Sequence, residues 1–91
     1  MVKKIVWTHR VDTDLNNAFL DLLEQSESIE TTTRVITEIY DSASILGTNP
    51  ENYPLDILKE NNKGNIRSYE KHTYRISYLI EEEAIYIIRV H

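Results

Sequence analysis

The sequence predicts an α+β domain in which two N-terminal helices pack on an antiparallel sheet. Two observations support this fold class. Apolar residues recur with helical spacing through the first half of the chain, and after Gly64 the apolar period changes to two. The expected order of elements is therefore β-α-α-β-β-β. A chain of 91 residues without an internal repeat makes a single domain, residues 1–91.

The first half is expected to hold one strand and two helices. Residues 2–7 are β-branched and aromatic, which is typical of a short strand. Asp12 or Thr13 can cap the first helix, and Ser26 or Ser28 the second. The two apolar stripes are Leu15, Ala18, Phe19, Leu22 and Leu23, then Val35, Ile36, Ile39, Ala43 and Leu46. Gly47 and Pro50 then provide the expected stop signal.

The second half alternates over residues 66–71, 74–80 and 84–91, which predicts three strands joined by tight turns. If the last turn centres on residue 82, Arg75 lies opposite Arg89 and Thr73 lies opposite His91. If the preceding turn centres on His72, Tyr69 lies opposite Arg75. The face expected toward the helices is apolar and holds Tyr74, Ile76, Tyr78, Ile80, Tyr86, Ile88 and Val90. The open face holds Arg67, Tyr69, Lys71, Arg75, Arg89 and His91.

Composition excludes several classes of protein. No stretch approaches the roughly 20 apolar residues of a membrane-spanning helix, and the N-terminus lacks the long apolar region of a secretory signal. The chain has no cysteine, so it has neither disulfides nor a thiol nucleophile. No histidine–carboxylate spacing indicates a metal, and no motif indicates a cofactor. We expect a small, soluble, cytoplasmic domain.

The charge is unevenly distributed along the chain. The formal net charge is −5, which argues against a surface coated in positive potential for nucleic acid. Residues 11–58 carry ten acids and a single base, Arg34, whereas residues 59–75 carry five bases and two acids. The basic segment therefore suggests a localised anionic partner. Ordinary solvated charge is the simpler explanation for any one of these lysines.

The open face could perform one kind of chemistry. Like charges directly across two strands are destabilising, so Arg75 beside Arg89 requires a partner. An acidic neighbour such as Glu51 or Asp56 would serve, and so would a bound phosphate. With His91 as acid or base and Tyr69 stacked on a nucleobase, such a face could cleave RNA by 2′-OH attack on the adjacent phosphate.

The segment from Gly64 to His91, GNIRSYEKHTYRISYLIEEEAIYIIRVH, resembles the RelE/ParE superfamily of toxins from bacterial type II toxin–antitoxin modules. The strand Tyr74-Arg75-Ile76-Ser77-Tyr78 is its most recognisable element, followed by the acidic turn and the strand IYIIRVH. A short strand ending in Trp7 and two helices also match the family layout. The resemblance implies the RelE-like fold and a cognate antitoxin protein as partner.

The superfamily has two active branches. Resemblance to its ribosome-dependent mRNA endonucleases, through Leu58-Lys59-x-Asn61-x-x-Gly64, implies Asp56 as base, Arg75 for phosphate and His91 as the histidine. Here Asp stands where those enzymes have Glu, and the last hairpin is two residues shorter. In the ParE branch the same fold poisons DNA gyrase without a nuclease triad. The segment NIRSYEKHTYRISY resembles ParE members more closely than the nucleases, and the net charge of −5 also favours the ParE branch.

Under either active branch, the basic segment and the open face provide a set of expected target-binding residues. They are Lys59, Lys63, Arg67, Tyr69, Lys71 and Arg89. A catalytically inactive module that only binds an antitoxin is the third hypothesis. A disordered antitoxin segment would fold on the toxin, presenting an apolar helix to it and acids to its arginines.

Overall fold

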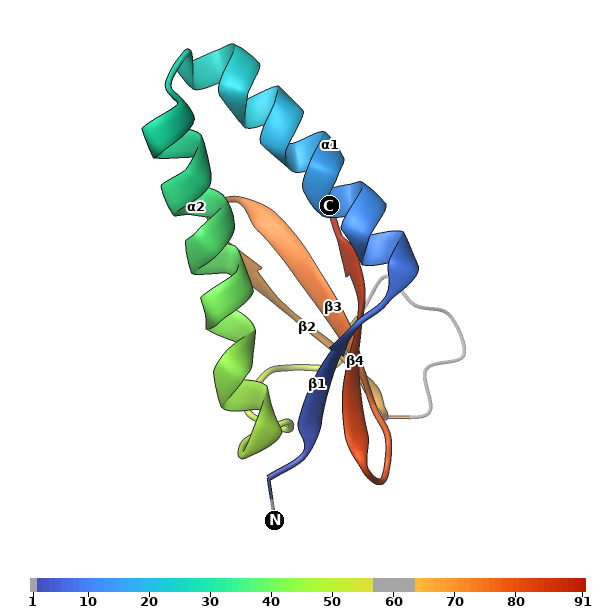
Figure 1. Cartoon of the computed structure of the whole chain (residues 1–91). Coiled ribbons are helices and arrows are strands. Elements are labelled where there is room, and N and C mark those ends of the chain that lie inside the picture. The colour runs from blue at the N-terminus through green and yellow to red at the C-terminus, as the bar shows by residue number, and fades with distance from the viewer. Residues whose placement is uncertain (1, 57–63) are drawn as a thin grey trace.

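The computed structural model describes residues 2–56 and 64–91. The chain begins with β1 (Lys4–Trp7), followed by the helices α1 (His9–Ser26) and α2 (Ile29–Ser42) and the short 3-10 helix η1 (Ala43–Gly47). Three strands complete it: β2 (Ile66–Lys71), β3 (Tyr74–Ile80) and β4 (Ala84–Val90). The two helices form a hairpin that covers one face of the sheet (Figure 1). The predicted α+β class and element order are therefore confirmed.

The sheet is mixed rather than antiparallel. Its strand order is β1-β4-β3-β2, and β1 pairs in parallel with β4, from Lys4 opposite Ala84 to Trp7 opposite Ile87. The expectation of a wholly antiparallel sheet was wrong for this strand. The helical hairpin, β2 and β3 lie between β1 and β4 in the chain, and such a long connection allows two strands to run the same way.

The helices pack through the stripes that the sequence predicts, with shifted boundaries. Val11 and Ala18 of α1 and Val35 and Ile39 of α2 are buried. Helix α1 starts at His9, before the expected caps Asp12 and Thr13. It starts there because β1 ends at Trp7 and the Thr8 hydroxyl donates a hydrogen bond to the Ile87 carbonyl of β4 (2.7 Å). Ser28 caps α2 as predicted, since its Oγ accepts from the Thr31 N–H (3.1 Å).

Gly47 ends the helical part of the chain for a packing reason. The Lys3 N–H donates to the Gly47 carbonyl (2.8 Å), which brings the start of β1 against η1. A Cβ atom at residue 47 would lie 2.7 Å from the Lys3 carbonyl oxygen. Only glycine permits this close approach, so the expected stop signal also joins the end of the helical layer to the start of β1.

Both expected hairpin registers were wrong by one residue. The β2–β3 turn contains two residues, His72 and Thr73, with positive φ values of 52° and 70°. Glu70 therefore pairs with Arg75, and Tyr69 pairs with Ile76. Because side chains alternate, this slip moves the odd-numbered residues of β2 to the helix-facing side. Arg67, Tyr69 and Lys71 thus share a face with the core, not with Arg75.

A β-bulge changes the faces of β4. The pairing shifts between Ser77 and Tyr78, so that Ile87 lies opposite Tyr78 but Arg89 lies opposite Ser77. The extra residue, Ile88, breaks the alternation: Ile85, Ile87 and Val90 are buried in the core. Tyr86 and Ile88, expected to face the helices, instead lie with Leu79 beside a hollow on the opposite face.

Candidate functional site

A group of polar side chains lies on the outer face, defined as the face of the sheet away from the helices. We call this group the polar cluster: Asp56, Ser68, Glu70, Arg75 and Ser77. Ile76 and Tyr78 are fully buried in the core, so the alternating residues Arg75 and Ser77 point the other way. Ser68 lies directly opposite Ser77 in the β2–β3 pairing. The cluster therefore joins two neighbouring strands and the segment before residue 57.

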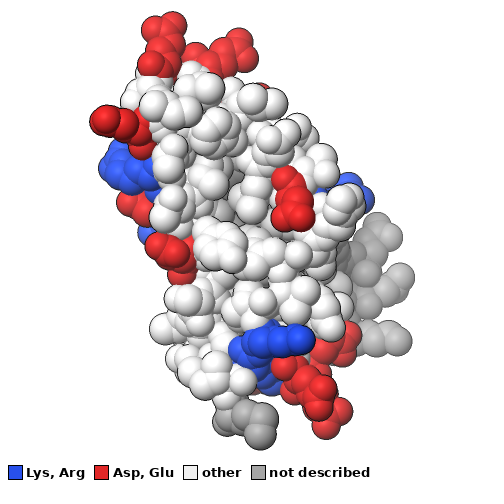
Figure 2. Space-filling model, viewed as in Figure 1, with Lys and Arg blue, Asp and Glu red and all other residues white. Residues whose placement is uncertain are grey.

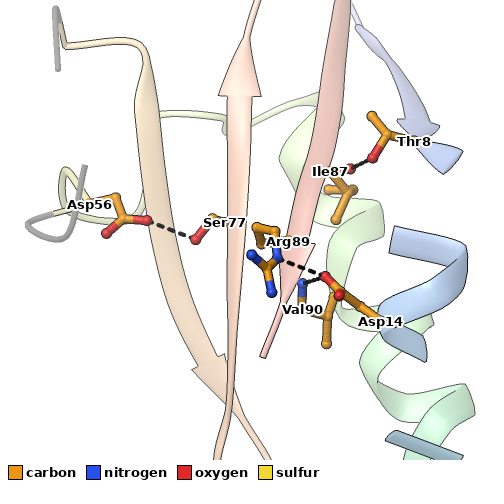
Figure 3. Close-up of polar contacts among 7 residues, drawn as sticks. All are labelled: Thr8, Asp14, Asp56, Ser77, Ile87, Arg89 and Val90. Atoms are coloured by element: carbon orange, nitrogen blue, oxygen red, sulfur yellow. Dashed lines mark hydrogen bonds and ion pairs between the residues drawn. The ribbon is translucent and has the colours of Figure 1, made fainter. Parts of the chain in front are cut away.

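Asp56 is the buried acid of the polar cluster. Its N–H donates to the Ile66 carbonyl (3.0 Å), which places it beside β2. The carboxylate is only 2% exposed, and its Oδ2 accepts from Ser77 Oγ at 2.7 Å (Figure 3). Because Ser68 is small, a carboxylate at the edge of β2 can reach a side chain on β3. A buried carboxylate requires such partners, since transfer from water is costly.

Arg75 supplies the positive charge next to this carboxylate. Its Nη1 donates to Ser68 Oγ (3.0 Å) and lies 4.0 Å from Asp56 Oδ1. Its Nη2 lies 3.8 Å from Glu70 Oε1, at a side chain that is 68% exposed. Of the two acids named from the sequence as possible neighbours of this arginine, Asp56 is therefore a neighbour in the structure. The Arg75 side chain remains 27% exposed, so its charge is still accessible from solvent.

The expected pairing of Arg75 with Arg89 is wrong. Arg75 instead exchanges two backbone hydrogen bonds with His91 (2.7 and 3.0 Å). Arg89 Nε donates to Asp14 Oδ2 of α1 (3.0 Å), and the Val90 N–H donates to the same oxygen (2.9 Å; Figure 3). Since β1 ends at Trp7, the end of β4 has no neighbouring strand on that side. The carboxylate of Asp14 takes the place of that strand.

The remaining predicted site residues do not join the polar cluster. Arg67 Nη1 donates to the Tyr53 carbonyl (2.7 Å), and its buried Nε has no hydrogen-bond partner among the described residues. The Tyr69 ring is 8% exposed and stacks on Tyr53, with ring centroids 4.4 Å apart. Burial raises the pKa of Tyr69, although its hydroxyl is within hydrogen-bond distance of Ser42 Oγ (2.8 Å). Lys59 and Lys63 lie outside the described residues.

The structure thus brings Asp56, Arg75 and the backbone of His91 together, but not the whole set named from sequence. Ser68, Ser77, Glu70 and Asp14 were not among the predicted site residues. Ser68 and Ser77 are small polar residues within the predicted strands. That signal indicates a site only once the register that places them opposite each other is known. Nothing local in the sequence indicates that Asp14 reaches β4.

The described residues contain neither a metal site nor a membrane-spanning helix. In residues 2–56 and 64–91, no three His, Cys, Asp or Glu side chains come together as metal ligands. Over the same residues, no helix is both long enough and apolar enough to span a membrane.

Comparison with solved structures shows what this fold is. The chain resembles one from a chromosomal ParDE TA system from P. aeruginosa, with a TM-score of 0.76 and 14% sequence identity. The match covers 98% of this chain and 94% of that chain. At this identity the likeness shows a shared fold, that of a protein from a toxin–antitoxin system. Among curated proteins, none matches this sequence.

The family is shown by the sequence itself. A family model for the ParE toxin of type II toxin-antitoxin systems, parDE, matches residues 5–91. The chain therefore belongs to the ParE toxin family. The resemblance to the RelE/ParE superfamily is confirmed, and within it the ParE branch is the one supported.

Proposed function

We propose that this toxin acts on DNA gyrase in the cytoplasm and is neutralised by a cognate antitoxin protein. The match to the ParE toxin family over residues 5–91 is the observation that carries the proposal. Proteins of this branch act by binding their target, so no catalytic group has to be exposed. Arg75, half-buried on the outer face, is the residue we assign to that target contact.

The surroundings of Asp56 support this assignment over the mRNA endonuclease. A general base must lie within hydrogen-bond reach of the substrate proton. Asp56 is 2% exposed and accepts a hydrogen bond from Ser77, with Arg75 beside it. In this environment the Asp56 carboxylate stabilises the sheet by neutralising the charge of Arg75. The net charge of −5 also disfavours stable binding to a highly anionic ribosome.

The test compares two activities of the purified protein. We expect it to inhibit supercoiling of relaxed plasmid by DNA gyrase, and the protein encoded by the adjacent reading frame to relieve that inhibition. In parallel, primer extension on ribosome-bound mRNA should show no new cleavage sites. Unaffected supercoiling together with mRNA cleavage would assign the chain to the endonuclease class. If neither activity appears while the neighbouring protein binds, the chain is an inactive antitoxin-binding module.

A further inference from the structure

The outer face carries a row of apolar side chains that crosses all four strands. Leu79 of β3 pairs with Ile66 of β2 on one side and with Tyr86 of β4 on the other. Tyr86 pairs in turn with Val6 of β1. Because its neighbours in β1 pack on the core, Val6 points to the outer face by alternation. We call these four half-buried residues, Val6, Ile66, Leu79 and Tyr86, the apolar row.

No helix or strand of the described chain covers the apolar row. Both helices and η1 pack on the other face of the sheet, where they form the core (Figure 1). The row borders a hollow of about 720 Å³, whose lining includes Leu79, Tyr86 and Ile88. The face of a sheet that meets water is ordinarily polar. A contiguous apolar patch on that face is instead typical of a surface that binds another protein.

The rim of this hollow is acidic. Glu81, Glu82 and Glu83 line it at the turn between β3 and β4, and all three are exposed. Two bases accompany them: Lys4 also lines the hollow, and Lys3 Nζ donates to the Glu81 carbonyl (2.6 Å). Figure 2 shows acidic side chains at this turn and, at the other end of the molecule, where α1 meets α2. The rim therefore keeps a negative charge beside an apolar floor.

Charge indicates which partner fits this surface. A second copy of the chain carries the same net charge of −5, and DNA is polyanionic, so the acidic rim disfavours both. A peptide segment that presents carboxylates is disfavoured in the same way. An enzyme that binds DNA, as the proposed target does, carries lysines and arginines where it holds the phosphates. The partner expected here is a protein surface that is apolar at its centre and basic around it.

We propose that the outer face docks on a basic surface of DNA gyrase, with the apolar row at the centre of the contact and Glu82 at its rim. The proposal rests on the proposed function, because it takes gyrase as the target. Leu79 and Arg75 both lie on the outer side of β3, about 13 Å apart along the strand. The contact assigned to Arg75 and the apolar row therefore belong to one surface.

Tyr86 tests the centre of this surface. Tyr86→Thr removes the aromatic ring and keeps a residue that favours strands. We expect it to weaken inhibition of gyrase supercoiling by about tenfold or more, because aromatic residues at the centre of an interface dominate binding. Tyr40→Thr is the matched control, since Tyr40 is 53% exposed on α2, on the other side of the sheet. Its inhibition should stay within about twofold of wild type.

Glu82 tests the rim. Glu82→Lys reverses a charge in an exposed turn, so this variant keeps the proposal testable even where Tyr86→Thr does not fold. Glu24→Lys makes the same change of charge at an exposed position of α1, near the other acidic end of the molecule. We expect Glu82→Lys to weaken inhibition by about fivefold or more and Glu24→Lys by less than about twofold.

Circular dichroism establishes that each variant folds, and binding of the neighbouring-frame protein is measured in parallel. Folded Tyr86→Thr and Glu82→Lys proteins that inhibit gyrase as strongly as wild type overturn the inference and leave the proposed function intact. If such variants lose only the binding of the neighbouring-frame protein, the outer face belongs to the antitoxin instead, which also overturns it. A wild-type protein that does not inhibit gyrase counts against the proposed function as well, so the two failures are distinguishable.

Discussion

At the scale of single residues, Asp56 and Ser77 show how the outer face is stabilised. Each is almost fully buried, and the 2.7 Å hydrogen bond between them crosses β2 above Ser68. A hydrogen bond to a charged group contributes more than a neutral one, and a buried acceptor that loses its donor keeps its desolvation cost. The contact therefore holds Pro54–Asp56 against the sheet.

We expect Ser77→Ala to lower the free energy of unfolding by about 1–2 kcal/mol, because Asp56 Oδ2 loses a donor in a buried site. Urea denaturation would measure the change. Ser44→Ala is the matched control, since Ser44 is exposed on η1 and should change stability by less than about 0.5 kcal/mol. Equal effects of the two substitutions would show that the Asp56 contact adds no stability.

Tyr78 makes the stability of the protein depend on pH in the alkaline range. Burial raises its pKa from 10.0 to about 12, and its hydroxyl donates to the Pro50 carbonyl (2.6 Å). Above pH 10 the unfolded chain releases this proton while the folded chain retains it, so stability falls as the pH rises toward 12. Chemical denaturation at a series of pH values should show a shallower alkaline loss in Tyr78→Phe than in wild type. Parallel slopes would contradict the assignment to Tyr78.

At the scale of elements, the β2–β3 hairpin sets the faces of the whole sheet. Its turn residues His72 and Thr73 both adopt positive φ, and a β-branched residue at φ 70° is an uncommon, strained conformation. The hydrogen bond between His72 Nε2 and Glu38 Oε1 (2.6 Å) ties this turn to α2. The hairpin thus keeps a register that the turn residues themselves do not favour.

Thr73→Gly should therefore stabilise the protein, by about 0.5–1 kcal/mol, because glycine adopts positive φ without steric cost. Thermal unfolding would show an increased midpoint. The same substitution at Thr48, where φ is −102°, should destabilise the chain through the added entropy of the unfolded state. A loss of stability at both positions would mean that the turn is not strained.

At the scale of the whole molecule, the separation of charge assigns different roles to the two layers. The helical layer is acidic, whereas Arg75, with 27% of its side chain exposed, lies on the outer face of the β2–β3 hairpin. Under the proposed function, Arg75 is a residue of this face that contacts the target. Two backbone hydrogen bonds join His91 to Arg75, and the proposed function assigns no role to the His91 imidazole.

We therefore expect Arg75→Ala to relieve growth arrest when the toxin is expressed without its antitoxin, and His91→Ala to preserve it. The imidazole is needed only by a nuclease, so the pair of variants separates the two classes. Growth curves after induction, with circular dichroism to show that both variants fold, measure the effect. Loss of toxicity in a folded His91→Ala protein would favour the endonuclease.

The sequence by itself determined the class and order of elements, the cap of α2 and the segregation of charge. These properties are local, because a hydrophobic period or a cap depends on residues a few positions apart. The strand motif around Arg75 was also sufficient to indicate the family, which the family model confirms.

Only the tertiary structure decided which residues meet. Two turn residues instead of three moved Tyr69 into the core. A one-residue slip at the β3–β4 turn and one extra residue in β4 together placed Arg75 beside His91 rather than Arg89. Asp14 reaches β4 across 75 positions of the chain. Register and bulges depend on how strands pack against a common core, and because the side-chain period is two, a single residue exchanges the two faces of a strand. The individual residues could therefore be named from the sequence, but which of them lie together in the site could not be predicted without the tertiary structure.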